Sequence, residues 1–477
     1  MSNLSELLPA GAGAKSADFV ASGTLGSGVT VALKSDGTVE AVGITPQSDG
    51  TPVVFESADT TYTGTTFDSN LNKIVIAYQD NGNSGYGTAI VGTVSGTSIS
   101  FGSAVVFESA SSNQISATFD SNANKVVIAY RDGGTSYGTA IVGTVSGTSI
   151  SFGSAVVFES ASVVHTSSNF DTNANKIVIA YKDFGNSSYG TAVVGTVSGT
   201  SISFGTPVVF QTSRSDWISS AFDSNLNKIV VAYEDVGNSS YGTSVVGTVS
   251  GTSISFGSPV VFESAFCEYT ATAFDANSNK IVVAYNQSTA SNGKAVVGTV
   301  SGTSISFGTP VVFETSATQY NSAIFDTNAK KVVIGYRNNG DGGDGYAIAG
   351  TVSGTDISFG STNEFETGST KWISSAFDSN SNKVVFAYED DSNLDYGTAV
   401  VYQTESSNSA DFIGITDQAI ANTATGAVII QGGVSEKVTG LTTGSDYYVQ
   451  DNGTLSTTVS SVPAGRALST TSILLEG

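Results

Sequence analysis

The sequence predicts an all-β protein: a seven-bladed β-propeller of four-stranded blades, inserted in a small β-sandwich or barrel-like domain. Two observations predict the propeller. A repeat with a period near 50 residues occurs seven times, and residues 51–405 show no helical periodicity. A third observation, strand-like sequence at both chain ends, predicts the small domain. We expect residues 1–43 and 406–477 to form that domain and residues 44–405 to form the propeller.

A Phe-Asp pair marks each repeat. Successive pairs are 52, 51, 52, 52, 51 and 52 residues apart, and their phenylalanines are Phe67, Phe119, Phe170, Phe222, Phe274, Phe325 and Phe377. Each pair precedes a turn such as DSNLNK, an apolar run such as KIVIAYQD, and the segments YGTAIVGTVSG and TSISFGSAVVFES. These segments are rich in Val, Ile, Tyr, Phe and Thr and are bounded by turn residues. We therefore predict four strands per repeat, A to D in chain order.

The two ends of the repeat region indicate that the ring closes on itself. The seventh repeat stops at YGTAVVYQTE and lacks its D strand, whereas a spare D strand, Pro52-Val53-Val54-Phe55-Glu56, precedes the first repeat. A ring closed by its own N-terminal strand shows this offset, and closure leaves no exposed edge strand. A stacked β-solenoid is the alternative, although its coils are usually shorter and their number is open.

The residues outside the repeats also read as strands and turns. ADFVASGTLGSGVTVALKSDGTVEAVG is typical of two strands, and ADFIGITDQAI, GAVIIQGGV, SDYYVQDNGTLST and RALSTTSILLEG follow the propeller. Each flank alone is small for an independent core, but together they reach about 115 residues, an ordinary domain size. We expect one β-domain built from both ends. Separate N- and C-terminal tails are the alternative.

Composition excludes several kinds of function. The chain has 18 Lys and Arg against 41 Asp and Glu, a net charge of −23, which argues against binding nucleic acid through phosphates. Its single histidine, His165, and single cysteine, Cys267, exclude His/Cys zinc sites and disulfide scaffolds within one chain. No apolar run approaches the ~20 residues of a membrane span, and the N-terminus lacks a secretory layout. We expect cytosolic synthesis, no membrane insertion and no cofactor.

The flanks and the repeats resemble known proteins. SELLPAGAGAK…ADFVASGTLGSGVTVALKSDGTVEAV and DFIGI…GLTTGSDYYVQDNGTLSTT…AGRALSTTSILL resemble virion proteins of marine tailed bacteriophages, including cyanophages. The repeat VGTVSGTSISFGTPVVFES is similar to stretches of phage fibre proteins. The shared motifs are structural glycines and turns, without catalytic residues. The resemblance implies a virion surface protein, either a tail fibre or a capsid decoration or head-fibre protein, assembled in the host cytoplasm and extracellular when mature.

One face of the predicted propeller varies between copies. The A–B and C–D turns are nearly identical, whereas the D–A and B–C connections diverge. The largest differences lie five residues before each Phe, at the start of the innermost strand: Tyr62, Gln114, His165, Trp217, Tyr269, Tyr320 and Trp372. Aromatic side chains with polar tips around a mouth suit sugar rings, so we predict a glycan or receptor site. The alternative is that these aromatics plug the channel or pack between blades.

A second variable position follows the tyrosine of strand B. Its copies are Gln79, Arg131, Lys182, Glu234, Asn286, Arg337 and Glu389. We expect these side chains to add hydrogen-bonding groups on the same face, with Arg131, Lys182 and Arg337 contacting the ligand.

Two repeated acidic motifs have explanations other than metal binding or catalysis. Asp68, Asn70 and Asn72 match the opening half of a calcium loop, but no Gly and bidentate Glu complete it. Asx turns are the favoured explanation and calcium the weak alternative. The aspartates two residues after the strand-B tyrosine offer carboxylates for glycoside hydrolysis, yet their repetition favours turn chemistry. They are Asp80, Asp132, Asp183, Asp235 and Asp390.

These observations lead to one hypothesis with two alternatives. We expect a non-enzymatic phage virion protein, displayed on the particle surface, whose variable propeller face binds a host-surface glycan or receptor. Its split domain would contact other virion proteins, and homo-oligomerisation is left open. The first alternative is a purely structural capsid decoration protein without a ligand. The second is a glycan-cleaving enzyme.

Overall fold

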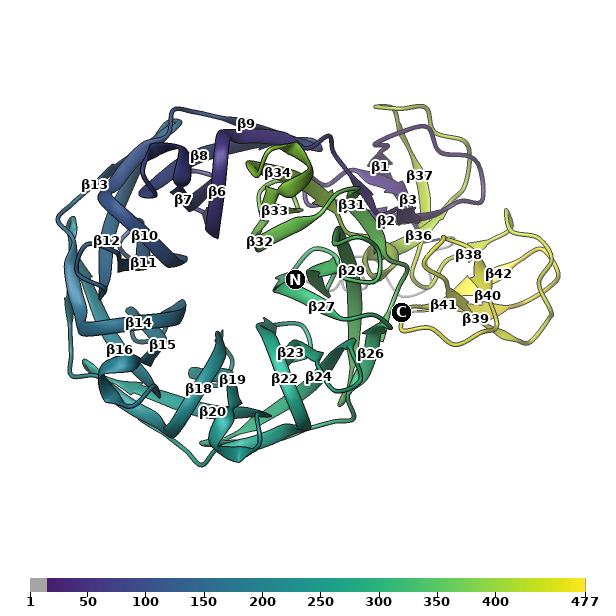
Figure 1. Cartoon of the computed structure of the whole chain (residues 1–477). Coiled ribbons are helices and arrows are strands. Elements are labelled where there is room, and N and C mark those ends of the chain that lie inside the picture. The colour runs from purple at the N-terminus through teal and green to yellow at the C-terminus, as the bar shows by residue number, and fades with distance from the viewer. Residues whose placement is uncertain (1–14, 477) are drawn as a thin grey trace. The chain divides into compact units, whose positions relative to one another are not determined.

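The computed structural model describes residues 15–476 (Figure 1). The chain divides into two compact units, one made of the residues up to Pro46 and from Glu405, the other of Gln47–Thr404. The segment SELLPAGAGA, part of the phage resemblance, lies outside the described residues. No helix of residues 15–476 is both long and apolar enough to cross a membrane.

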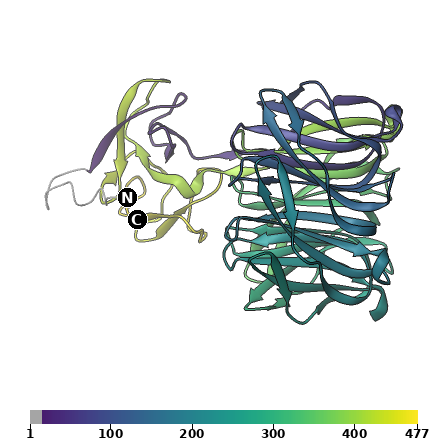
Figure 2. The same ribbon diagram turned by 90° about the vertical axis from the view of Figure 1, so that its left-hand side faces the viewer.

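Residues 47–404 form a ring of seven antiparallel blades, seen along its axis in Figure 1 and from the side in Figure 2, which confirms the predicted propeller. Strand A lies nearest the axis, and its copies are β6 (Val53–Asp68), β10 (Val105–Asp120), β14 (Val156–Asp171), β18 (Val208–Asp223), β22 (Val260–Asp275), β27 (Thr318–Asp326) and β32 (Thr370–Asp378). Strand B pairs with it and comprises β7 (Lys73–Asp80), β11 (Lys125–Asp132), β15 (Lys176–Asp183), β19 (Lys228–Asp235), β23 (Lys280–Gln287), β28 (Lys331–Asn338) and β33 (Lys383–Asp390).

The outer half of each blade consists of strand C and a fourth strand in two pieces. Strand C comprises β8 (Tyr86–Ser95), β12 (Tyr137–Ser146), β16 (Tyr189–Ser198), β20 (Tyr241–Ser250), β24 (Asn292–Ser301), β29 (Asp344–Ser353) and β34 (Tyr396–Gln403). The first piece of the fourth strand is β9 (Ser98–Phe101), β13 (Ser149–Phe152), β17 (Ser201–Phe204), β21 (Ser253–Phe256), β25 (Ser304–Phe307) and β30 (Asp356–Phe359). The second piece pairs with the start of strand C. It is the first half of the next 16-residue inner strand, or else β26 (Val311–Glu314) or β31 (Asn363–Glu366).

The N-terminal strand closes the ring, as the sequence predicts. In the seventh blade, β34 pairs with β5 (Ser48–Asp49) and with the first half of β6, so that Tyr402 faces Asp49 and Ala399 faces Val53. An apolar cluster joins this blade to the first one, with Val385 and Ala387 packed among Ile74 and Ile76. Strand pairing and apolar packing therefore join the last blade to the first.

The middle of strand B is continuously apolar because neighbouring blades cover both of its faces. In the third blade, Ile177 and Ile179 pack in a cluster with Val127 and Ala129 of the blade before, whereas Val178 and Ala180 pack with Ile229 and Val231 of the blade after. The core is thus divided among the blade interfaces. Strand A has no such covering on its axial side, which leaves its side chains free to line the axis.

The second unit draws its strands from both flanks. One antiparallel sheet has the order β1 (Ser16–Val20), β37 (Thr425–Ile430), β36 (Phe412–Thr416), β2 (Thr30–Leu33), β3 (Val39–Ala41). The other has the order β38 (Val434–Ser435), β42 (Ile473–Leu475), β41 (Pro463–Ala467), β39 (Asp446–Val449), β40 (Leu455–Ser456). Ile415 and Ile429 of the first sheet share one apolar cluster with Tyr447 and Ile473 of the second, so the two sheets pack as a sandwich.

Short elements complete the chain. The smallest strand pair joins β4 (Ile44–Thr45) to β35 (Ser406–Ser407). Single 3-10 turns follow strand B in four blades, at η2 (Asn81–Asn83), η3 (Phe184–Asn186), η4 (Val236–Asn238) and η5 (Asp391–Asn393), and η6 (Ser409–Asp411) belongs to the sandwich.

Candidate functional site

The seven variable residues of strand A lie at a break in strand pairing rather than at the start of a strand. In the first five blades the D and A segments form one continuous 16-residue strand, and the pairing register shifts around the variable residue, for example between Thr61 and Gly64. At that bulge each variable residue adopts a left-handed conformation, with φ between 49° and 55° in all seven copies. A left-handed backbone costs a non-glycine residue roughly 1–2 kcal/mol, yet no copy is glycine. We call these seven residues the axial ring.

Six members of the axial ring touch in series. The ring centroids are 4.9 Å apart for His165 and Trp217, 4.0 Å for Trp217 and Tyr269, and 5.4 Å for Tyr269 and Tyr320. The series continues from Tyr320 to Trp372 at 5.0 Å and from Trp372 to Tyr62 at 4.0 Å. Gln114 fills the remaining position, and its Oε1 accepts a hydrogen bond of 2.6 Å from the His165 backbone N–H. The six predicted aromatic residues thus form one arc of contacting side chains, and the Gln114 amide occupies the gap in it.

The axial ring surrounds a hollow of about 180 Å³, which all seven of its members line. Every member is half-buried, so each side chain keeps part of its surface exposed. A second hollow of about 480 Å³ adjoins the first, because Thr63, Ile115, Thr166 and Ile373 line both. Serine and threonine side chains make up much of the second lining. The aromatics therefore surround the first hollow instead of filling it completely.

A tier of alternating residues lies directly below the axial ring. Its members follow the ring residues in sequence: Thr63, Ile115, Thr166, Ile218, Thr270, Asn321 and Ile373. The Thr63, Thr166 and Thr270 hydroxyls donate to the backbone carbonyls of ring residues in the preceding blades. Asn321 does the same through Nδ2, 3.0 Å from the Tyr269 carbonyl. These bonds hold the bulged backbone of one blade against the next, and so fix the position of the ring.

The sequence predicts that the second variable position, including Arg131, Lys182 and Arg337, adds ligand contacts on the same face, and the structure places it beside the axial ring but outside the lining of this hollow. Among the described residues, none of its seven copies lines the hollow. Each pairs with the residue before a ring member, as Arg131 does with Asn113 and Lys182 with Val164. Several of its copies bond to polar groups of neighbouring strands. Gln79, for instance, donates to the Ser111 hydroxyl at 3.1 Å, and Asn286 accepts from the Thr318 backbone N–H at 3.2 Å.

The Asp216 carboxylate lies close to His165 and to two cationic side chains. Its carboxylate accepts from Lys182 of the preceding blade and from Arg214, whose Nη2 lies 2.6 Å away, and His165 Nε2 is 3.8 Å distant. Burial lowers the pKa of His165 to about 4, more than the Asp216 charge raises it. His165 is therefore a neutral member of the axial ring at neutral pH.

The repeated aspartates act in turns, as the sequence indicates. The Asp68 carboxylate accepts from the backbone N–H groups of Asn70 and Leu71 at 2.9 and 3.0 Å, and Asn72 adopts φ 55°. Asp80 likewise accepts from the Asn83 N–H at 3.1 Å. These are Asx-type turns, in which the carboxylate serves the backbone.

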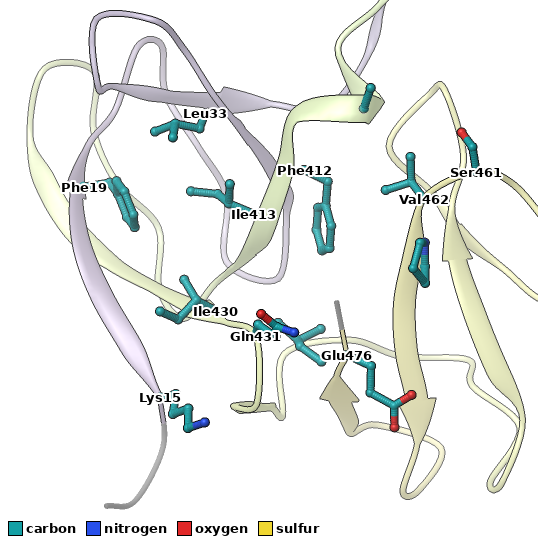
Figure 3. A pocket seen from close by; sticks show the side chains of 13 residues that line it. Lys15, Phe19, Leu33, Phe412, Ile413, Ile430, Gln431, Ser461, Val462 and Glu476 are labelled. Carbon is teal, nitrogen blue, oxygen red and sulfur yellow. The ribbon is translucent and has the colours of Figure 1, made fainter. Parts of the chain in front are cut away.

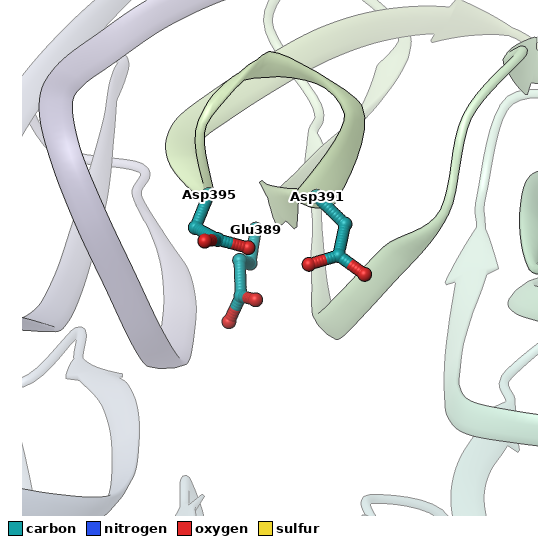
Figure 4. Close-up of side chains that lie close together, drawn as sticks. All are labelled: Glu389, Asp391 and Asp395. Carbon is teal, nitrogen blue, oxygen red and sulfur yellow. The ribbon is translucent and has the colours of Figure 1, made fainter.

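One acidic cluster has the spacing that a cation site needs. Glu389, Asp391 and Asp395 place carboxylate oxygens within 4.8 Å of one another (Figure 4). The Lys371 ammonium lies among them, 3.0 Å from Glu389 and 2.6 Å from Asp391. Burial raises the pKa of Glu389 to about 7, and a hydrogen bond with Asp395 lowers that of Asp391 to about 2. A divalent cation could use these oxygens only by displacing Lys371, so the cluster is a lysine-neutralised network.

The sandwich contains a separate, largely apolar hollow of about 420 Å³. Phe19 and Leu33 from one flank line it together with Phe412 and Ile413 from the other, and Lys15 and Glu476 lie toward one end (Figure 3). Sequence reasoning missed this hollow because its walls come from residues about 400 positions apart. It also missed Asp216 and Lys371. Each is the residue before a ring member, and variation at that position between the copies could have indicated that it belongs to the variable face.

Comparison with known proteins gives no family. No family model and no curated protein matches this chain. Similar solved structures include AofleA from Arthrobotrys oligospora, with 8% identity, 72% of this chain and 95% of that chain covered, and a TM-score of 0.44. They also include the SapL1 lectin in complex with alpha methyl fucoside (11%, 64% and 96%, TM-score 0.40) and the Dos1 propeller (12%, 75% and 95%, TM-score 0.47). The fold and the site described above rest on the strand pairing and side-chain contacts of this chain.

Proposed function

We propose that this chain is a non-enzymatic glycan-binding protein of a tailed-phage particle, and that the axial ring binds a sugar of a host-surface glycan. The observation that carries the proposal is the axial ring itself. Seven copies of one strained backbone position all bear large side chains, and these surround one hollow. Left-handed residues such as Asn72 also recur in the turns after strand A, where turn geometry accounts for them, whereas the axial ring carries the strain within a strand. Strained positions outside ordinary turns cluster at binding and catalytic sites.

The chemistry of the ring suits carbohydrate. Trp217 and Trp372 offer wide apolar faces, and the Tyr62, Tyr269 and Tyr320 phenols and the Gln114 amide offer hydrogen-bonding groups. A sugar ring presents an apolar face and a rim of hydroxyls, which matches that combination. The repeated carboxylates are used in turns, which supports a binding protein rather than a hydrolase.

The virion assignment rests on the resemblance of the flanks and repeats to proteins of marine tailed phages. In this proposal the sandwich contacts other virion proteins, the propeller meets the host surface, and the mature protein lies on the outside of the particle. Imaging of the purified particle with an antibody to the propeller tests this part, since labelling of capsid or tail supports it and unlabelled particles contradict it.

A purely structural decoration protein is the second candidate. The close contacts within the aromatic arc favour it, because aromatic pairs contribute roughly 0.5–1.5 kcal/mol each to stability without any ligand. In that case the ring only fastens the blades together at the axis.

A glycan array separates the two candidates. We expect the full chain to bind at least one glycan, and the Trp217→Ala/Trp372→Ala double variant to lose that binding by at least tenfold. Phe184→Ala, which removes an exposed aromatic outside the hollow, is the matched control and should leave binding unchanged. Silence of the wild-type chain across diverse host glycans would favour the decoration role.

A further inference from the structure

We infer that the axial ring accepts one uncharged terminal sugar per chain and rejects acidic sugars. This inference rests on the proposed glycan-binding function and deepens it by naming the ligand class. It concerns the charge of the ligand and the number bound, neither of which follows from the aromatic ring alone.

The lining of the hollow carries no charge. Its residues are Tyr, Thr, Gln, Ile, His, Trp and Asn, and among the described residues no Asp, Glu, Lys or Arg contributes to it. The one titratable base is His165, which burial keeps neutral at neutral pH. The adjoining hollow is lined in the same way by hydroxyl, amide and apolar groups, again without a charged side chain in the described chain.

Several charged side chains close to the ring are already paired with each other. Lys182 and Arg214 bind Asp216, and Lys371 binds Glu389 and Asp391, all behind or beside the ring. A carboxylate or sulfate brought into the hollow would therefore find no cation in contact with it. Burying an ionised group without a partner is costly, whereas the hydroxyls of a neutral sugar can exchange bonds with water for bonds with phenols and amides.

Two arginines offer the strongest contrary possibility. The Nε atoms of Arg131 and Arg337 are buried without a hydrogen-bond partner in the described part of the chain. Burial raises the pKa of the Tyr320 phenol and the Arg337 charge partly opposes that rise, so Arg337 acts on the ring electrostatically. Neither arginine lines the hollow, so an acidic sugar could use them only from outside the ring.

The size and place of the hollow set the stoichiometry. At about 180 Å³ it lies below the ~300 Å³ at which pockets for drug-sized ligands begin, so it offers room for one small ligand group and not for several. It lies where all seven blades meet, so the seven repeats make one site together instead of seven separate sites.

The test uses the full chain and pairs of oligosaccharides whose terminal sugars have nearly the same size but differ in charge, such as glucose against glucuronate and galactose against galacturonate. Isothermal titration should give one bound ligand per chain, with the acidic member of each pair at least tenfold weaker, about 1.4 kcal/mol. Gln114→Arg places a cation in the gap of the aromatic arc and should raise the affinity for the acidic member at least tenfold. Arg337→Gln should leave the neutral member unaffected.

The outcomes are distinguishable. Failure of every sugar to bind contradicts the proposed function itself. Equal or tighter binding of the acidic member contradicts this inference alone. If Arg131→Gln or Arg337→Gln then abolishes the acidic binding, the second variable position is a ligand contact after all. More than one ligand per chain contradicts the single axial site.

Discussion

Two sets of residues in the propeller differ in how much they vary between blades: the buried residues that hold each blade together, which we call the blade frame, and the axial ring. In the blade frame, a strand-B tyrosine donates to a glutamate in six of the seven blades, as Tyr78 does to Glu56 and Tyr181 to Glu159, both at 3.0 Å. A phenylalanine such as Phe158 packs on that tyrosine, with centroids 5.2 Å apart. In the axial ring the backbone repeats equally well, but the side chains differ. The constant residues of the blade frame therefore maintain the fold, and the side chains of the axial ring are those that differ between blades.

A third tier, in the wall of the bore, lies between these extremes. Ser116 bonds Ser168 of the next blade, Ser167 bonds Ser220, and Ser322 bonds Ser375, at 2.7–2.9 Å. Ala271 faces the interface to the sixth blade, where the equivalent residue is Ala323. A hydroxyl therefore pairs with a hydroxyl in these three interfaces, and the interface with Ala271 has a second alanine at the equivalent position.

The largest effect on stability is expected in the frame. Phe158→Ala removes a buried ring that contacts Tyr181 and Phe204, and should lower the free energy of unfolding by about 3–5 kcal/mol. Urea denaturation measures the loss. A loss below about 1 kcal/mol would contradict the division between frame and ring, since it would make the frame as tolerant as the ring.

A buried carboxyl beside the ring should make stability depend on pH. Burial raises the pKa of Glu234 to about 7, above an unfolded value of about 4.3. A raised folded pKa contributes stability below the unfolded pKa, and that contribution is lost as pH rises through 7. Glu234→Gln should therefore stabilise the protein at pH 8 by on the order of 2 kcal/mol and change little at pH 4. The exposed Glu364→Gln is the control, and equal effects at both pH values would contradict the assignment.

The ring should be far less sensitive in stability than in binding. Trp217→Gly relieves a left-handed backbone worth roughly 1–2 kcal/mol but loses two aromatic contacts and the apolar burial of a half-buried indole, so it should lower the free energy of unfolding by less than Phe158→Ala does. Trp217→Ala loses the same contacts but keeps the strain. It should be about 1 kcal/mol less stable than the glycine variant, the reverse of the usual order within strands. An alanine variant more stable than the glycine variant would show that the bulge is unstrained.

A small effect is expected at the matched interfaces. Ser167→Ala leaves the Ser220 hydroxyl without its 2.9 Å partner and should cost about 1 kcal/mol of unfolding free energy. The converse double change, Ala271→Ser with Ala323→Ser, should be close to neutral, whereas either single change should destabilise. Additive single and double effects would mean that these positions are not paired.

Much of the fold could be predicted because its signals repeat. The Phe-Asp spacing fixes the blade count, and the displaced D strand at Val53 predicts the closure seen between β34 and β6. The same comparison of copies locates the seven ring residues that line one hollow. A pattern that occurs seven times gives a reliable prediction, since each copy independently supports the same strand assignment.

The conformation of the ring could not be predicted in this way. Tyr and Trp have no preference for a left-handed backbone, so the residue type at Trp217 does not predict the bulge found there. The bulge in turn shifts the register of strands A and B. Arg131 therefore faces Asn113 and not a ring residue, so the second variable position lies beside the axial ring and outside the lining of the hollow.

The most direct test of the account uses the chain's own fluorophores. Its only two tryptophans, Trp217 and Trp372, both belong to the axial ring, so tryptophan fluorescence reports on that tier alone. Titration with a glycan that the chain binds should produce a saturable change in intensity or wavelength, with the same midpoint as calorimetry. Calorimetric binding that leaves the tryptophan fluorescence unchanged would place the ligand elsewhere and contradict the axial ring as the binding site.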